Sequence, residues 1–254
     1  MANWSDPRPS ARFAPQSQIA SAARDEGLRS YMLSVYNYMA SAVFLTGIIA
    51  VLVANTSLMS LFAQEVLTRQ GPALVPTALG WIAVLLPLAF GLPLSFSRGG
   101  FKLSTLQFLF WGYAVSVGVS FFTLFIVYTD TSIAQAFFAA AAGFAGLSLY
   151  GYTTKRNLQP LGAFLVIGVV GLLVALLINV FLQSGTLNLI ISVAGVGIFA
   201  VLTAFRTQEI KLVYDEVAGT EMQDKVAVLG AFQLYVTFIN MFLFLLRLIG
   251  SSRN

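Results

Sequence analysis

The chain contains no cysteine and no histidine, and it has few charged residues. Asp, Glu, Lys and Arg together make up 9% of its 254 residues. The two absences exclude disulfide bonds, thiolate or imidazole metal sites, cysteine nucleophiles and histidine-based proton relays. Most hydrolase chemistry is excluded with them. We therefore expect no enzyme, no catalytic residue, no resident metal and no cofactor.

Apolar sequence fills the chain instead. Hydrophobic residues make up 58% of it and its mean hydropathy is +0.84, which is far too apolar for a soluble domain of this size. We predict an all-α membrane protein that crosses the lipid bilayer several times. The net charge of +4 comes from basic residues beside apolar runs. Membrane topology explains this placement better than nucleic-acid binding does.

Seven apolar runs are long enough to cross a bilayer as helices. The connections between several of them are short, so neighbouring spans are expected to be antiparallel. The second run contains Pro76, Pro87 and Pro93, which predict a kinked or broken helix. The predicted spans are Tyr31–Val53, Leu74–Leu94, Leu103–Tyr128, Ile133–Tyr152, Leu161–Leu182, Leu187–Phe205 and Val226–Ile249.

The segments outside the spans suggest one domain with two tails. Residues 1–27 are polar and predict a mobile cytoplasmic tail, residues 28–250 form the seven-helix transmembrane domain, and residues 251–254 are a C-terminal tail. Between the first two spans, Leu58 and Phe62 predict a short amphipathic helix at the membrane interface. The connection 206–225 carries five acidic residues and predicts a solvated loop of mixed charge.

The distribution of Lys and Arg predicts the orientation. Eleven basic residues fall on the side of the N-terminus and three on the other. The positive-inside rule then places the N-terminus in the cytoplasm and the C-terminus outside a bacterial inner membrane. The eleven are Arg8, Arg12, Arg24, Arg29, Arg98, Lys102, Lys155, Arg156, Arg206, Lys211 and Lys225, and the three are Arg69, Arg247 and Arg253.

The last span carries a polar stripe. Gln233, Thr237 and Asn240 are spaced by four and three residues, so they share one face of a helix. Lipid cannot satisfy such side chains, and the stripe must face protein, water or an ion. We therefore predict that this helix is central and that the other spans surround it.

Small residues in two spans predict close helix packing. Gly143 and Gly146 in the fourth span, and Gly168 and Gly171 in the fifth, would make flat helix faces. Such faces let the backbones of neighbouring membrane helices approach closely.

Several strings resemble the bacterial branch of the Bax inhibitor-1 family. They include the run from Phe121 to Thr129, which reads FFTLFIVYT, and the highly specific run from Leu147 to Arg156, which reads LSLYGYTTKR. Shorter matches occur from the segment near Gly27 to the last span, so the resemblance covers nearly the whole chain. It implies a seven-helix fold with a central last helix and an activity as a pH-sensitive calcium leak channel or permease.

The resemblance also implies a pair of sensor aspartates, and this chain lacks both. The family strings Tyr-Asp-Thr-Gln and Leu-Tyr-x-Asp-Phe are matched here by FRTQ, with Arg206, and by LYVTF, with Thr237. All ten carboxylates of the chain fall in predicted tails or loops. Calcium prefers six to eight oxygen ligands that include carboxylates, and two close aspartates would sense pH by sharing a proton. Calcium conduction or pH gating is therefore expected to be altered or lost.

Two interpretations of these positions stay open. Arg206 either ends its helix at the cytoplasmic surface or reaches the stripe near Thr237 and closes the inner mouth of a pathway. Thr237 either bonds its own helix or lines the pathway, and Gln233 and Asn240 either join helices or line it. We group Thr203 with these four as candidate pathway or sensor positions.

Two functions of different classes follow. The first is a leak channel or permease, with calcium as the transported ion by resemblance only. The second is a non-transporting membrane regulator that binds partner proteins, because some bacterial relatives are handled by membrane-bound proteases.

Overall fold

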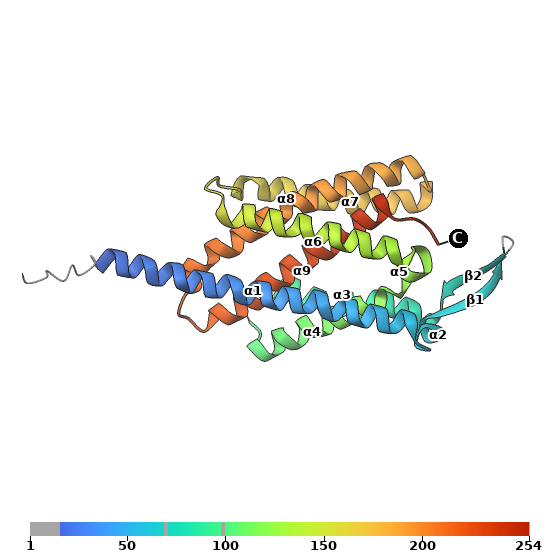
Figure 1. Cartoon of the computed structure of the whole chain (residues 1–254), viewed down its shortest axis with the longest axis horizontal. Coiled ribbons are helices and arrows are strands. Elements are labelled where there is room, and N and C mark those ends of the chain that lie inside the picture. Colours follow the sequence, from blue (N-terminus) through green and yellow to red (C-terminus); the bar gives the residue numbers. More distant parts are fainter. Residues whose placement is uncertain (1–15, 69–70, 98–99, 254) are drawn as a thin grey trace, which may run out of the picture.

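The computed structural model describes residues 16–68, 71–97 and 100–253, which form a bundle of long helices with a small hairpin at one end (Figure 1). Seven helical segments have the length and hydropathy to cross a membrane, which confirms the predicted all-α membrane fold. The elements are α1 Gln16–Asn55, α2 Met59–Phe62, β1 Ala63–Thr68, β2 Gly71–Pro76, α3 Ala78–Phe96, α4 Leu103–Ser120, α5 Phe122–Val127, α6 Asp130–Thr153, η1 Gln159–Leu161, α7 Gly162–Leu182, α8 Gly185–Val217 and α9 Met222–Ile249.

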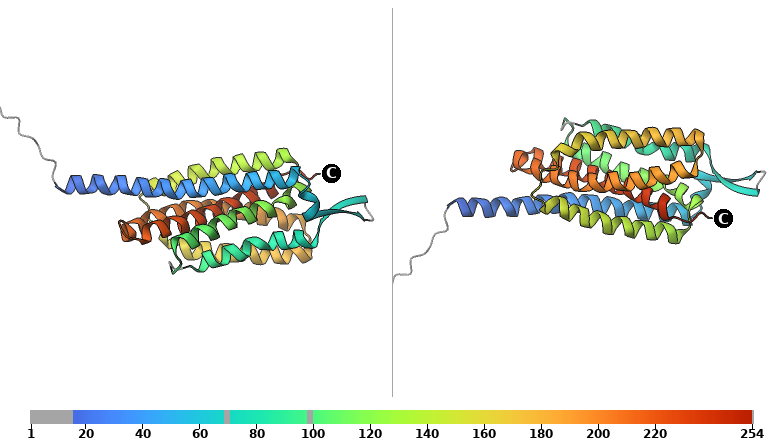
Figure 2. Two further views of the ribbon diagram at one scale, coloured as in Figure 1. Left: turned by 90° about the horizontal axis from the view of Figure 1, so that it is seen from below. Right: turned by 90° about the horizontal axis from the view of Figure 1, so that it is seen from above.

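Helix α9 is the centre of the bundle. In the most apolar 18 residues of α9, 67% are buried, whereas the buried share is 11–33% in the other six spans. It packs against α1, α4, α6 and α8, whereas α3 packs mainly on α4 and α7 mainly on α8. Figure 2 shows α9 running between the other helices. The predicted central position of the last helix is confirmed.

Helix α7 presents most of its surface to the outside. The most apolar stretch of the segment Gln159–Leu182, which contains α7, has a mean hydropathy of 3.0 and is only 11% buried. Large apolar side chains stand exposed along it, among them Phe181 at 87% and Ile167 at 71%. Such a surface is stable in contact with lipid tails and not with water.

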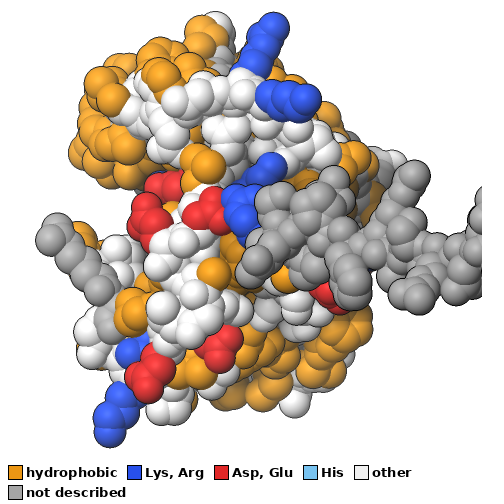
Figure 3. All heavy atoms as spheres, turned by 90° about the vertical axis from the view of Figure 1, so that its left-hand side faces the viewer, with side chains coloured by type: hydrophobic (Ala, Val, Ile, Leu, Met, Phe, Trp, Pro, Cys, Tyr) orange, Lys and Arg blue, Asp and Glu red, His pale blue; other side chains and the backbone are white. Residues whose placement is uncertain are grey.

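One end of the bundle, which we call the charged end, is where α1 projects beyond the other helices (Figure 1), and acidic and basic side chains gather on this face (Figure 3). The Arg24 guanidinium of α1 donates two hydrogen bonds to the Asp215 carboxylate of α8, at 2.8 and 2.6 Å. Two turns further along α1, the ring of Tyr31 lies 5.2 Å from the ring of Tyr214. These contacts hold α1 against the last turns of α8 at this end of the bundle.

The opposite end, which we call the hairpin end, carries β1, β2 and the C-terminus. The two strands pair antiparallel, from Ala63 with Pro76 to Thr68 with Gly71. Thr77 caps α3 by accepting a hydrogen bond from Gly80 N, and its hydroxyl donates to the Leu61 carbonyl at 2.6 Å. These bonds attach the base of the hairpin to the start of α3.

The hairpin corrects the prediction for the connection between the first two spans. The expected amphipathic helix is only the four-residue α2, and the residues after it are extended. Leu74 and Pro76, predicted to begin the second span, belong to β2, and α3 starts at Ala78. The apolar side chains of β2 continue without a break into those of α3, so hydropathy alone merges the strand with the helix.

The charged end corrects two further boundaries. Helix α8 does not end at Phe205 but continues to Val217, so most of the expected solvated loop is helical. The residues after Phe205 are polar but are good helix formers, and charge ends a membrane span without ending a helix. Helix α1 begins at Gln16, inside the segment expected to be a mobile tail. Residues 1–15 of that tail, together with Arg69 and Arg98, lie outside the described part of the chain.

The predicted third span is present but interrupted. The helix is interrupted at Phe121, between α4 and α5. The two helices together, Leu103–Val127, still have the length of one span.

The small-residue prediction is wrong for three of its four glycines. A Cβ built on Gly143, Gly146 or Gly171 would meet no atom within 4 Å. A close approach of α6 to α8 is found instead at Gly151, whose Cβ would lie 2.3 Å from the Ala204 carbonyl oxygen of α8. A repeated glycine spacing does not reveal which side of a helix faces a neighbour and which faces lipid.

Candidate functional site

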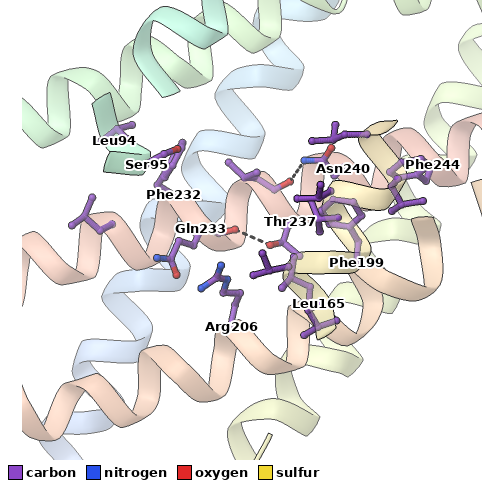
Figure 4. Close-up of a pocket in the computed structure, with 18 of the residues that line it drawn as sticks. Leu94, Ser95, Leu165, Phe199, Arg206, Phe232, Gln233, Thr237, Asn240 and Phe244 are labelled. Atoms are coloured by element: carbon purple, nitrogen blue, oxygen red, sulfur yellow. Dashed lines mark hydrogen bonds between the residues drawn. The ribbon is translucent and has the colours of Figure 1, made fainter. Parts of the chain in front are cut away.

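A cavity of about 500 Å³ lies beside α9, between α9, α8, α7 and the end of α3 (Figure 4). Its apolar wall comes largely from α7, with Leu165, Val169 and Leu172 among the lining residues. Its polar side comes from α8 and α9. The cavity exists because α3 and α7 pack on α4 and α8 and leave one face of α9 uncovered.

The predicted polar stripe of α9 faces this cavity. Gln233, Thr237 and Asn240 all line it, as their spacing indicates. The Thr237 hydroxyl donates to the Gln233 carbonyl and the Asn240 amide donates to the Val236 carbonyl, both at 2.8 Å. These bonds stay within α9, so Thr237 and Asn240 line a space and do not join helices.

Arg206 of α8 lines the same cavity, and Figure 4 shows its side chain pointing toward Gln233 and Thr237. Its Nη1 donates to Glu209 Oε2 at 2.5 Å, and its guanidinium carbon lies 5.6 Å from the centre of the Phe205 ring. The side chain is 28% exposed. Within residues 16–68, 71–97 and 100–253 it makes no hydrogen bond to Thr237 or Asn240, so the structure holds no hydrogen-bonded plug.

Thr203 lies apart from this group. Its side chain is fully buried, and its hydroxyl donates to the Phe199 carbonyl of its own helix at 2.8 Å. It does not belong to the cavity lining. The structure therefore brings together four of the five candidate positions.

The cavity lining contains no carboxylate among the residues that the structure describes. The nearest acid in contact with a lining residue is Glu209, which is bonded to Arg206. Hydroxyl and amide oxygens alone are a poor set of ligands for calcium, and a fixed guanidinium repels a divalent cation.

Sequence reasoning missed three polar residues of the site. Ser95 and Ser97 at the end of α3 line the cavity, and the Ser97 hydroxyl is buried without a hydrogen-bond partner in the described part of the chain. Glu209 stands three residues after Arg206, which is the spacing of an ion pair on a helix. Predicting a loop after Phe205 concealed that signal.

The family model described as an inhibitor of apoptosis-promoting Bax1 matches residues 28–254. The chain belongs to the Bax inhibitor-1 family. This family member is 40% identical over 231 residues to an uncharacterized protein of Rickettsia prowazekii, covering 91% of this chain and 93% of that protein.

Two further relatives agree over a similar length. An uncharacterized protein of Caulobacter vibrioides is 38% identical over 231 residues, covering 91% of this chain and 92% of its own. The inner membrane protein YbhL of Escherichia coli is 34% identical over 229 residues, covering 89% and 94%. Together with its seven membrane-length helices, these matches make this family member an integral membrane protein.

Proposed function

We propose that this Bax inhibitor-1 family member is a membrane permease whose solute pathway passes through the cavity beside α9, and that calcium is not its main solute. The observation that carries the proposal is the composition of the cavity. A central helix turns a neutral polar stripe toward it, and Arg206 supplies the charge on the facing helix.

The position of the cavity supports a transport role. It lies against the most buried helix of the bundle and is lined by residues of four helices. Sites between the helices of a bundle are typical places for small solutes, and polar groups at membrane depth are favoured only where they line such a space. Gln233 and Asn240 are partly exposed beside this space and Thr237 is buried, and polar residues inside a membrane bundle commonly belong to functional sites.

The charge of the cavity argues against calcium. At the two positions where the resemblance implies aspartates, the chain has a guanidinium and a hydroxyl. Restoring carboxylates at both positions supplies oxygen ligands and a titratable pair. The purified protein should be reconstituted into liposomes that contain a calcium-sensitive dye, and flux should be compared at several pH values.

We expect the natural chain to give calcium flux close to that of empty vesicles, and Arg206→Asp with Thr237→Asp to give a pH-dependent flux. A matched control is Arg156→Asp with Thr153→Asp, which adds the same charges at exposed positions of the same end. Rapid calcium flux through the natural chain would overturn the exclusion of calcium.

A second function is favoured by the charged end. There α1 projects beyond the other helices and is joined to the last turns of α8 by Arg24 and Asp215, which gives a helical surface at the end of the bundle. Such a surface suits a regulator that binds a partner, for example a membrane-bound protease. This alternative is favoured if neither the natural chain nor the aspartate variant transports any solute in liposomes.

A further inference from the structure

The guanidinium of Arg206 keeps hydrogen-bond donors that Glu209 does not use. Glu209 engages Nη1, and in the described part of the chain no hydrogen bond is formed by Nε or Nη2. A guanidinium offers five N–H donors in a planar fork that matches a carboxylate. Arg206 therefore keeps donors for a second anion, on the side that faces the cavity in Figure 4.

A further donor lies near that side. The Gln233 side chain points toward Arg206 in Figure 4, and its amide makes no hydrogen bond within residues 16–68, 71–97 and 100–253. Thr237 and Asn240, by contrast, donate to carbonyls of α9. Among the described residues, the cavity lining has one cation, one uncommitted amide and no carboxylate, which is the donor set of an anion site.

The rest of the cavity is apolar. The wall formed by α7 includes Leu165, Val169 and Leu172, and Phe199 of α8 and Phe232 of α9 add aromatic surface. A bare inorganic anion would leave this apolar surface uncovered. An organic anion with an apolar body would contact both the polar donors and the apolar wall of the cavity. A volume of about 500 Å³ is in the range of small-molecule sites.

We propose that the cavity binds an amphipathic monocarboxylate, with its carboxylate on Arg206 and Gln233 and its apolar body against α7. This proposal rests on the proposed function, because it names the class of solute for the same cavity. Glu209 then acts as a tethered competitor that occupies one guanidinium nitrogen when the cavity is empty.

The carboxylate can come from two sources. It can be a small organic acid that arrives from the aqueous side, or a fatty acid that arrives through the bilayer. The second source fits the apolar wall of the cavity, where Val170 and Leu173 of α7 are 54% and 57% exposed. Both sources present the same chemistry to Arg206.

The test is a binding measurement with 4-fluorobenzoate and the full chain in lipid nanodiscs, followed by fluorine NMR against empty nanodiscs. The neutral 4-fluorobenzamide and the cationic 4-fluorobenzylammonium serve as matched probes. We expect the carboxylate to bind and both matched probes to bind at least about tenfold more weakly, because only the carboxylate pairs with the guanidinium.

Variants separate charge from folding. Arg206→Gln should weaken 4-fluorobenzoate at least about tenfold, and Arg206→Lys, which keeps the charge without the fork, should weaken it less. Glu209→Gln should strengthen binding several-fold, which a purely structural ion pair does not predict. Arg156→Gln is the control, because its side chain is exposed at the same end and outside the cavity.

Competition with a long-chain fatty acid supplied in the bilayer distinguishes the two sources. If a low mole fraction of the fatty acid displaces 4-fluorobenzoate, the natural carboxylate comes from the bilayer. If 4-fluorobenzoate binds and the fatty acid does not displace it, the natural carboxylate comes from the aqueous side. Equal binding of the amide, or full binding by a folded Arg206→Gln protein, would overturn the proposal. This binding measurement contains no calcium. The carboxylate proposal can therefore fail while the exclusion of calcium stands, and calcium flux can overturn that exclusion while carboxylate binding stands.

Discussion

The Tyr235 hydroxyl of α9 donates a hydrogen bond to Thr46 Oγ1 of α1 at the centre of the bundle. The two oxygens are 2.7 Å apart, and Thr46 Oγ1 itself donates to the Ala114 carbonyl of α4 at 2.9 Å. Because a threonine hydroxyl has a single hydrogen, Tyr235 must be the donor of the first bond. Both side chains are almost completely buried. This chain of bonds joins three spans where no water competes.

Thr46→Val should destabilise the protein more than Tyr235→Phe does. The valine leaves the Tyr235 hydroxyl and the Ala114 carbonyl without their partner, which costs about 1–3 kcal/mol. The phenylalanine removes only one donor, which costs about 0.6 kcal/mol by comparison with hydrogen bonds in other membrane bundles. Unfolding in mixed micelles measures both. Thr153→Val at an exposed site is the control, and a Thr46→Val protein as stable as this control would contradict the assignment.

Two glycine-to-alanine substitutions in α6 should change the stability of the protein in opposite directions. Gly151→Ala places its methyl group 2.3 Å from the Ala204 carbonyl oxygen, so α6 and α8 must separate at a cost of about 1–3 kcal/mol. Gly146→Ala meets no atom within 4 Å and should gain up to about 1 kcal/mol from helix propensity. Thermal unfolding of the two proteins side by side checks this. Equal effects would show that α6 and α8 are not in close contact at Gly151.

The pair Arg24 and Asp215 should hold the projecting turns of α1 against α8. Arg24→Asp or Asp215→Arg alone places like charges together and should speed amide hydrogen exchange in α1 before Tyr31. The exchanged pair, Arg24→Asp with Asp215→Arg, should restore much of the protection. If the double variant exchanges as fast as the single ones, the two side chains do not act on each other. High salt should reduce the difference between the variants.

The absence of cysteine makes the orientation directly measurable. In single-cysteine variants, Gln64→Cys on β1 and Glu216→Cys on α8 place exposed thiols at opposite ends of the bundle. The positive-inside rule predicts that an impermeant maleimide labels Gln64→Cys from outside intact cells and Glu216→Cys only after the membrane is opened. Labelling in the reverse order would place the N-terminus outside the cytoplasm.

Hydropathy predicted the number of spans and the polar stripe predicted the central helix, because both depend on properties that act residue by residue. The face shared by Gln233, Thr237 and Asn240 follows from helix periodicity alone, and the structure turns that face to the cavity. Arg206 reaches the same cavity from α8. The sequence could place these residues on faces but could not supply the wall, because α7 and the end of α3 meet them through tertiary packing.

The errors have a different physical origin. Hydropathy places strand β2 in the second span, because Ala73, Leu74 and Val75 are as apolar as the helix that follows. The extension of α8 was missed because Arg206 and Glu209 end the apolar run without ending the helix. Both errors arise where one apolar or polar run crosses a change in backbone structure. Without the helical extension of α8, the sequence does not predict the ion pair between Arg206 and Glu209.

The last few residues after α9 form an anchor at the hairpin end. Ser251 N donates to Ser132 Oγ at 2.9 Å, the Ser251 carbonyl accepts from Thr129 N at 3.2 Å, and Arg253 N donates to the Val127 carbonyl at 2.8 Å. A piston-like displacement of α9 along its axis would break all three bonds, whereas a tilt about this end would keep them. Alternate exposure of the cavity is thus easier by pivoting of α9 about its Ile249 end, with a displacement that grows along the helix through Asn240 and Gln233 toward Met222.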